Sequence, residues 1–198
     1  SDTEMLLNVF ATELQEQIHN QELQPEIIFN AIKNLHNRIQ GSYASIALIS
    51  GHGLLAFRDP FGIRPLVIGK RISLTTQKEE WMVASESLVL ENNDYQVVRD
   101  VNPGEAIFIT HNGEFYSKQC SENPSLYPCS FEYVYLARPD SVMNGISVYK
   151  ARLKMGDYLA DTIKQTINSG DVDVVMPIPD SSRPAAMQVA RQLGIEYR

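Results

Sequence analysis

The sequence predicts two successive kinds of architecture, an α+β region over residues 1–140 and an α/β region over residues 141–198. Three observations support this division. Residues 1–40 carry apolar side chains at helical spacing, and residues 41–135 form short strand-length runs separated by turn residues. Residues 148–198 then alternate helix, strand, helix and strand, which is the pattern of a parallel sheet with covering helices.

Two helices are predicted at the start of the chain. Ser1 and Glu4 have the spacing of a capping box, and Asp2 in the same first turn complements the positive end of the helix dipole. A second helix is predicted over residues 25–39, because Pro25 suits a first helical position and one apolar stripe follows it.

A mostly antiparallel sheet region is predicted next. The expected strands are 43–49, 54–58, 64–68, 82–85, 96–99, 106–110 and 114–118. Asn112-Gly113 between two strands predicts a type I′ hairpin turn. Asp59-Pro60-Phe61-Gly62 predicts a second turn, and we expect the flanking Arg58 and Arg64 to be solvated.

The last part of the chain contains a strand-to-helix junction. We expect a helix over 148–167, a buried strand over 171–179 and a helix over 184–193. In open α/β sheets ligands bind beyond the carboxyl ends of strands, and the amino end of a following helix suits phosphate. Asp180, Ser181 and Ser182 occupy that junction, although the same residues also fit an ordinary helix cap.

Composition excludes several classes of protein. The 198 residues have a net charge of −7 and no stripe of Lys or Arg, which argues against a nucleic-acid surface. Apolar stretches are far shorter than the ~18 residues of a membrane span, and no signal-peptide pattern is recognised. We therefore expect a cytoplasmic protein that binds neither nucleic acid nor membrane.

Cysteines and histidines give no sign of a disulfide framework or a metal site. Cys120 and Cys129 are the two cysteines, and we expect both to be free thiols. The four histidines lack metal-ligand spacing, and each is expected at the surface or in a loop. They are His19, His36, His52 and His111. No Ser/His/Asp set and no glycine-rich phosphate loop of the P-loop type can be identified.

Several segments, in this order, resemble one family. They are SDTEMLLN (1–8), AFRDPFGIRPLVIGKR (56–71), VASES (83–87), PGEAI (103–107), CSFEYVYLARPDS (129–141) and DVDVVMPIPDSS (171–182). Together they resemble the glutamine phosphoribosylpyrophosphate amidotransferases, also called amidophosphoribosyltransferases. The resemblance covers essentially the whole chain.

The resemblance implies a fold and a reaction. Residues 1–140 would be the rear part of an N-terminal-nucleophile (Ntn) glutaminase domain, an αββα sandwich. Residues 141–198 would be the first part of a type I phosphoribosyltransferase domain. The family transfers ammonia from glutamine to phosphoribosyl pyrophosphate (PRPP), giving 5-phosphoribosylamine, glutamate and pyrophosphate, the first step of de novo purine synthesis.

The resemblance also implies site residues and partners. Asp2 matches the position that receives the α-ammonium of glutamine. Asp180, Ser181 and Ser182 match the loop that binds pyrophosphate, and Ser181 matches a hydroxyl that helps to hold Mg²⁺. Besides glutamine and PRPP, purine nucleotides are expected as feedback inhibitors, and the protein is expected to be a homo-oligomer. One branch of the family binds a [4Fe–4S] cluster through a cysteine at the position of Cys129, but we expect no cluster here.

The departures from the family pattern concern catalysis. The nucleophilic cysteine and the arginine that grips substrate lie upstream of the matching positions, and the signature with paired aspartates lies downstream. We therefore expect an internal fragment with no catalytic residue of its own, inactive by itself. Two alternatives remain: a non-catalytic scaffold or binding remnant of an Ntn amidotransferase, and a sugar-phosphate glutamine amidotransferase.

Overall fold

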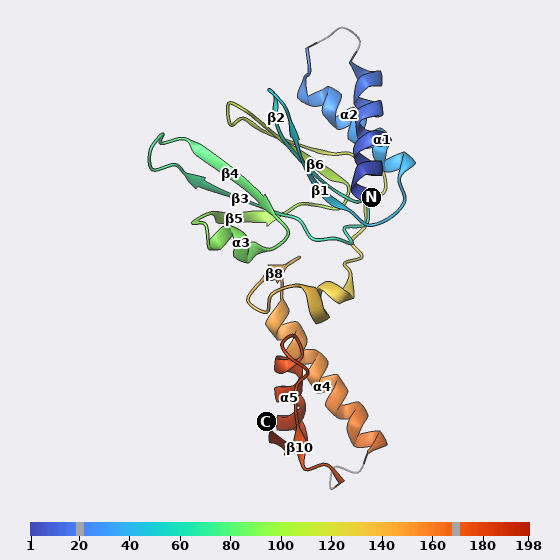
Figure 1. Ribbon diagram of the computed structural model, residues 1–198, viewed down its shortest axis with the longest axis vertical. Coiled ribbons are helices and arrows are strands. Elements are labelled where there is room, and N and C mark those ends of the chain that lie inside the picture. Colours follow the sequence, from blue (N-terminus) through green and yellow to red (C-terminus); the bar gives the residue numbers. More distant parts are fainter. Residues whose placement is uncertain (19–21, 168–170) are drawn as a thin grey trace. The chain divides into compact units, whose positions relative to one another are not determined.

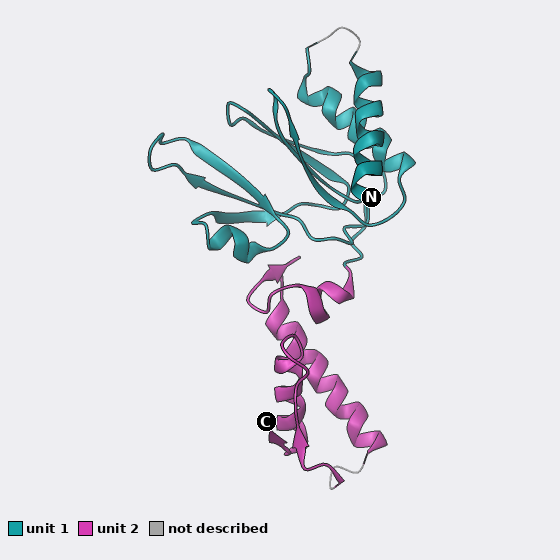
Figure 2. Cartoon of the chain, viewed as in Figure 1, with its two compact units in different colours: residues 1–128 teal, residues 129–198 magenta. Residues whose placement is uncertain are grey.

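The computed structural model describes residues 1–18, 22–167 and 171–198. The chain forms two compact units, unit 1 over residues 1–128 and unit 2 over residues 129–198 (Figure 2). His19 lies outside the described residues, and none of the described helices is long and apolar enough to cross a lipid bilayer.

Unit 1 begins with the two predicted helices, α1 (Asp2–Gln17) and α2 (Pro25–Arg38) (Figure 1). The capping box is confirmed, since the Ser1 hydroxyl accepts a hydrogen bond from the Glu4 amide at 3.3 Å. Pro25 stands at the start of α2, as its missing N–H group allows.

The first sheet of unit 1 has four strands in the order β1-β2-β6-β7, all antiparallel. These strands are β1 (Ala44–Ile49), β2 (Gly53–Arg58), β6 (Glu105–Thr110) and β7 (Phe115–Gln119). Alternate side chains of β2 and β6, such as Phe57 and Phe108, pack against α1 and α2 in one apolar cluster.

The second sheet has three antiparallel strands in the order β4-β3-β5. They are β3 (Val67–Ile72), β4 (Glu79–Ala84) and β5 (Gln96–Asp100), and the short helix α3 (Ser87–Glu91) precedes β5. Ile107 of the first sheet and Ile68 of the second belong to one buried cluster, whereas Val67 and Leu90 form another on the α3 side. The layers of unit 1 are thus a helix pair, two sheets and a short helix.

One predicted turn type and one predicted strand start in unit 1 are wrong. The β6–β7 connection is not a type I′ turn, because Gly113 (φ +88°) has the left-handed conformation and Asn112 does not. The Gly113 amide bonds to the Thr110 carbonyl at 2.9 Å, which gives a three-residue loop with a glycine bulge. The strand expected over 64–68 begins three residues later, at Val67, because Arg64 belongs to a hydrogen-bonded loop described below.

Unit 2 begins with one turn of π-helix, η1 (Glu132–Leu136), and a short hairpin of β8 (Val142–Met143) and β9 (Ile146–Ser147). The long helix α4 (Val148–Thr166) follows, as predicted. Its buried Arg152 donates hydrogen bonds to the carbonyls of Tyr133 and Ala137, both at 2.7 Å. These bonds join η1 to α4, so the compact unit begins at Cys129, twelve residues before the predicted boundary at 140/141.

The end of the chain has the predicted α/β order. β10 (Val174–Val175) pairs in parallel with β11 (Glu196–Tyr197), and α5 (Arg183–Leu193) lies between them in sequence. The prediction of a buried strand over 171–179 is wrong, since Met176 and Ile178 are 69% and 81% exposed. Among the described residues β10 pairs with one strand, β11. The apolar residues that follow β10, such as Met176 and Ile178, are therefore not covered by further strands.

Candidate functional site

Asp2 lies at the rim of a cavity of about 520 Å³ in unit 1. The first turns of α1, the segment before β1 and one turn of the β2–β3 loop surround it. The lining residues are Asp2, Thr3, Met5, Leu6, Ile39, Gln40, Gly41, Ser42, Tyr43, Ala44, Ser45 and Arg64. The lining residues carry one carboxylate (Asp2) and one guanidinium (Arg64) among hydroxyl, amide and apolar side chains. This arrangement suits a small zwitterion, whose ammonium would bind the Asp2 carboxylate.

Asp59 holds two walls of this cavity together, although it does not line it. Its buried carboxylate accepts a hydrogen bond from the Tyr43 amide at 3.3 Å and another from the Arg64 amide at 3.3 Å. It also accepts from the amides of Phe61 (3.0 Å) and Ile63 (3.1 and 3.2 Å). Hydrogen bonds to an ionised acceptor are stronger than neutral ones, so the loop and the strand entry are fixed relative to each other.

The exposure of the Arg58 side chain differs most from the prediction. We predicted a solvated side chain, but Arg58 is almost completely buried. Its guanidinium donates to the carbonyls of Arg64, Val101 and Gly62, each at 2.7 Å. Three backbone carbonyls thus accept hydrogen bonds from the guanidinium, which explains why a buried arginine is tolerated there. Arg64, in contrast, is exposed as predicted.

Tyr43 is also held at its hydroxyl end. The hydroxyl lies 2.7 Å from Nδ1 of His36, and the two rings stack with their centroids 5.8 Å apart. His36 was expected at the surface but is buried, and burial lowers the pKa of its imidazole from 6.5 to about 4. Burial and the nearby Asp59 charge raise the pKa of Tyr43 above its usual range. His52 and His111 are exposed, as expected.

The predicted phosphate loop connects β10 to α5 in unit 2. Asp180 is exposed and pairs with Arg183 at 2.7 Å, whereas Ser181 and Ser182 are half-buried. The Ser182 hydroxyl donates to the Ile178 carbonyl, and Ser182 is the N-cap residue of α5 without making a side-chain capping bond. The three predicted residues therefore share one loop at the amino end of a helix of 11 residues.

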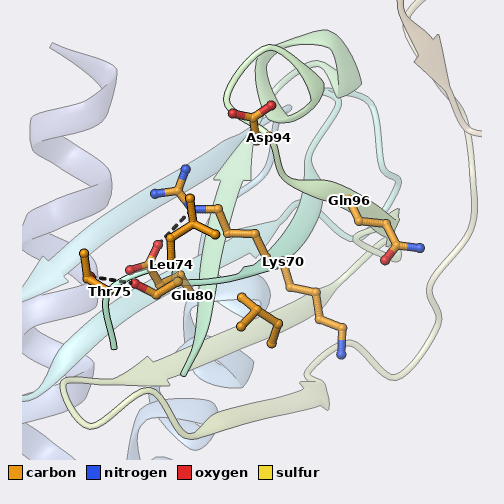
Figure 3. A pocket seen from close by; sticks show the side chains of 9 residues that line it. Lys70, Leu74, Thr75, Glu80, Asp94 and Gln96 are labelled. Carbon is orange, nitrogen blue, oxygen red and sulfur yellow. Dashed lines mark hydrogen bonds and ion pairs between the residues drawn. The ribbon is translucent and has the colours of Figure 1, made fainter. Parts of the chain in front are cut away.

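Another cavity of about 620 Å³ lies on the second sheet of unit 1. Lys70, Arg71, Leu74, Glu80 and Asp94 are among the residues that line it (Figure 3). Two of its charged groups are paired across the β3–β4 ladder, since Arg71 Nε donates to Glu80 at 2.8 Å. Outside residues 19–21 and 168–170, no three His, Cys, Asp or Glu side chains are grouped so that they could hold a metal ion.

The two cysteines are free thiols, as expected. Cys120 is buried, and burial raises the pKa of its thiol to about 12. Cys129 is half-buried.

Comparison with known proteins finds similar enzymes. The chain is 52% identical over 200 residues to the amidophosphoribosyltransferase of Pseudomonas aeruginosa and 50% identical over 198 residues to that of Escherichia coli. It is 45% identical over 202 residues to the Saccharomyces cerevisiae enzyme of the same name. Over its whole length this chain is similar to amidophosphoribosyltransferases. The match covers the whole chain in each case but 39% of each relative's length.

Two solved structures match the fold of this chain over part of their length. Glutamine PRPP amidotransferase from B. subtilis, complexed with ADP and GMP, matches 96% of the chain at a TM-score of 0.71 and 32% identity. The chain covers 43% of that structure. A structure described as the allosteric regulatory enzyme of purine biosynthesis matches with a TM-score of 0.73 and 32% identity, and the chain covers 42% of it. No family model matches the sequence.

Proposed function

We propose that the full-length protein containing this chain transfers ammonia from glutamine to PRPP. The products are 5-phosphoribosylamine, glutamate and pyrophosphate, which makes this the first step of de novo purine synthesis. The proposal rests on the match over the whole chain to amidophosphoribosyltransferases at 45–52% identity. The chain itself spans 39% of their length and is proposed to be inactive alone.

Unit 1 is proposed to bind glutamine as part of an Ntn glutaminase domain. Its order of layers, helix pair, sheet, sheet and short helix, is compatible with an αββα sandwich. In the 520 Å³ cavity the Asp2 carboxylate would receive the α-ammonium of glutamine, because an opposite charge at the mouth of a cavity fixes one end of an amino acid. The thiol that attacks the side-chain amide would come from outside this chain.

Unit 2 is proposed to be the first part of a type I phosphoribosyltransferase domain. The loop of Asp180, Ser181 and Ser182 would bind the pyrophosphate of PRPP through backbone amides at the amino end of α5. Its hydroxyl and carboxylate oxygens are donors that Mg²⁺ accepts, and Ser181 would supply one ligand while substrate phosphates supply others. When bound, Mg²⁺ would neutralise charge on the departing pyrophosphate.

The partners proposed for the full-length protein follow from its relatives. Purine nucleotides are proposed as feedback inhibitors, because the B. subtilis relative was solved with ADP and GMP. We propose a homo-oligomer. We also propose that it binds no [4Fe–4S] cluster, because residues 119–124 resemble the cluster-free branch of the family more closely. Iron analysis and light scattering of the full-length protein test these two points.

Product analysis tests the proposed function. The full-length protein is incubated with Mg²⁺, PRPP and either glutamine or ammonium chloride, and phosphoribosylamine and pyrophosphate are measured. Equal amounts of phosphoribosylamine, pyrophosphate and, with glutamine, glutamate are expected. Amination of fructose 6-phosphate in place of PRPP would support the sugar-phosphate alternative, and no product with any acceptor would support the scaffold alternative. This chain alone should give no turnover.

A further inference from the structure

Two of the three segments that surround the Asp2 cavity are held by one buried carboxylate. Tyr43 lines the cavity at the entry to β1, and Arg64 lines it from the β2–β3 loop. These two residues are 21 positions apart and belong to different parts of unit 1. The Asp59 carboxylate accepts a hydrogen bond from the backbone amide of each, at 3.3 Å in both cases.

The backbone of Asp59 strengthens this connection. The Asp59 amide donates to the Tyr43 carbonyl at 2.8 Å, so Asp59 and Tyr43 bond to each other in both directions. The Asp59 carbonyl accepts from the amides of Gly62 (3.0 Å) and Gly104 (2.9 Å). Asp59 therefore joins the strand entry, its own turn and the segment before β6.

Arg58 completes the arrangement from the other side of the turn. Its guanidinium donates to the Arg64 carbonyl at 2.7 Å, while Asp59 accepts from the Arg64 amide. The backbone of Arg64 is thus held at both of its polar groups by two consecutive buried residues. The side chain of Arg64 leaves this fixed backbone beside the cavity that contains Asp2.

We infer that Asp59 is a positioning residue for the glutamine site: it fixes the cavity walls against which the substrate held by Asp2 must be aligned. This inference rests on the proposed function. Asp59 does not line the cavity, so it acts through Tyr43 and Arg64 rather than by touching substrate. Replacing one of its two carboxylate oxygens should displace the backbones of Tyr43 and Arg64. Small displacements of a binding site strongly reduce the fraction of bound substrate that is aligned for reaction.

The test compares nitrogen sources in the full-length protein. Asp59→Asn replaces one acceptor oxygen by an NH₂ group that faces backbone N–H groups. We expect the KM for glutamine to rise at least about tenfold, with ammonia-dependent phosphoribosylamine formation within about twofold of wild type. A merely structural defect would lower both rates together. The matched control is Glu105→Gln, another buried carboxylate, which accepts from Arg99 and Asn102 and does not line the cavity.

Gly62→Ala tests the same loop without changing a buried charge, and Gly51→Ala is its control. A Cβ atom on Gly62 (φ +57°) would lie 2.9 Å from Pro103 and 3.2 Å from the Arg58 guanidinium carbon. Gly51 also has a positive φ (+76°), but nothing lies within 4 Å of its Cβ position. Gly62→Ala should raise the KM for glutamine, and Gly51→Ala should leave it unchanged.

The outcomes separate this inference from the proposed function. Wild-type protein that makes no phosphoribosylamine from either nitrogen source contradicts the proposed function. If wild type is active, an unchanged KM in both Asp59→Asn and Gly62→Ala overturns the positioning role. Equal loss of both nitrogen activities in these two variants also overturns it, because the residue then supports the whole fold.

Discussion

Acidification is predicted to destabilise unit 1 through one histidine, His36. Its imidazole is buried against Tyr43 and Phe57, and burial lowers its pKa from 6.5 to about 4. Between these pH values the unfolded chain binds a proton that the folded chain does not bind. The stability contribution is therefore fully present above pH ~6.5 and is lost as the pH falls toward 4.

The size of this effect follows from the two pKa values. At about 1.36 kcal/mol for each pKa unit, the full difference amounts to about 3 kcal/mol of unfolding free energy. The loss at pH 5 should be about 2 kcal/mol, since the unfolded histidine is then mostly protonated and the folded one is mostly neutral.

Trp81 provides the assay. It is the single tryptophan and lies in unit 1, so its fluorescence during urea unfolding reports this unit. Between pH 7.5 and pH 5.0, wild type should lose about 2 kcal/mol more than His36→Gln, which cannot gain a charge. His111→Gln, a change at an exposed histidine, should behave like wild type. Equal pH dependence of wild type and His36→Gln would refute the reasoning.

Three further predictions concern packing and thiol reactivity. Arg152→Met leaves the carbonyls of Tyr133 and Ala137 without their donor, so helix melting followed by circular dichroism should show unit 2 destabilised by about 2–4 kcal/mol, unlike exposed Lys150→Met. Gly156→Ala places a Cβ 2.6 Å from the Ala185 carbonyl oxygen between α4 and α5, and the same melting experiment should show a loss of about 1–3 kcal/mol. Ellman's reagent at pH 8 should modify Cys129 in the folded chain and reach Cys120 only in urea, because burial raises the pKa of Cys120 to about 12. Unchanged melting in either variant, or equal labelling of both thiols in the folded chain, would contradict the corresponding prediction.

Local signals predicted most of the helices and strands. The capping box of Ser1 and Glu4, Pro25 at a helix start and the apolar stripe that follows Pro25 each act within a few residues, so the sequence alone reveals them. The hairpin at Asn112-Gly113 was placed correctly but given the wrong turn type. Gly113 has a positive φ and Asn112 does not, so the loop has three residues instead of the two of a type I′ turn.

The errors share a different cause, because they concern contacts between distant residues. Arg58 is buried by carbonyls that include Val101, 43 positions away, and His36 is buried by Tyr43 and Phe57. No local pattern distinguishes these residues from exposed ones. The exposure of Ile178 likewise depends on how many strands lie beside β10, and residues 171–179 alone do not show that number.

The candidate site was predicted in part. The structure places Asp2 at a cavity and brings Asp180, Ser181 and Ser182 into one loop, while their roles stay predictions. Asp59 and Tyr43 were missed. The adjacent charged residues Arg58 and Asp59, directly after the buried strand end Ala56-Phe57, were the available signal.

We propose that Asp2 binds glutamine and that the loop of Asp180, Ser181 and Ser182 binds PRPP in one enzyme. The most direct test of this proposal measures both nitrogen sources in full-length Asp2→Asn and Ser181→Ala. Asp2→Asn should raise the KM for glutamine at least about tenfold and leave the ammonia-dependent rate unchanged, because it removes one charge contact to the substrate ammonium. Ser181→Ala should raise the KM for PRPP with either nitrogen source. A defect of Asp2→Asn in the ammonia reaction, or a defect of Ser181→Ala confined to glutamine, would contradict this assignment.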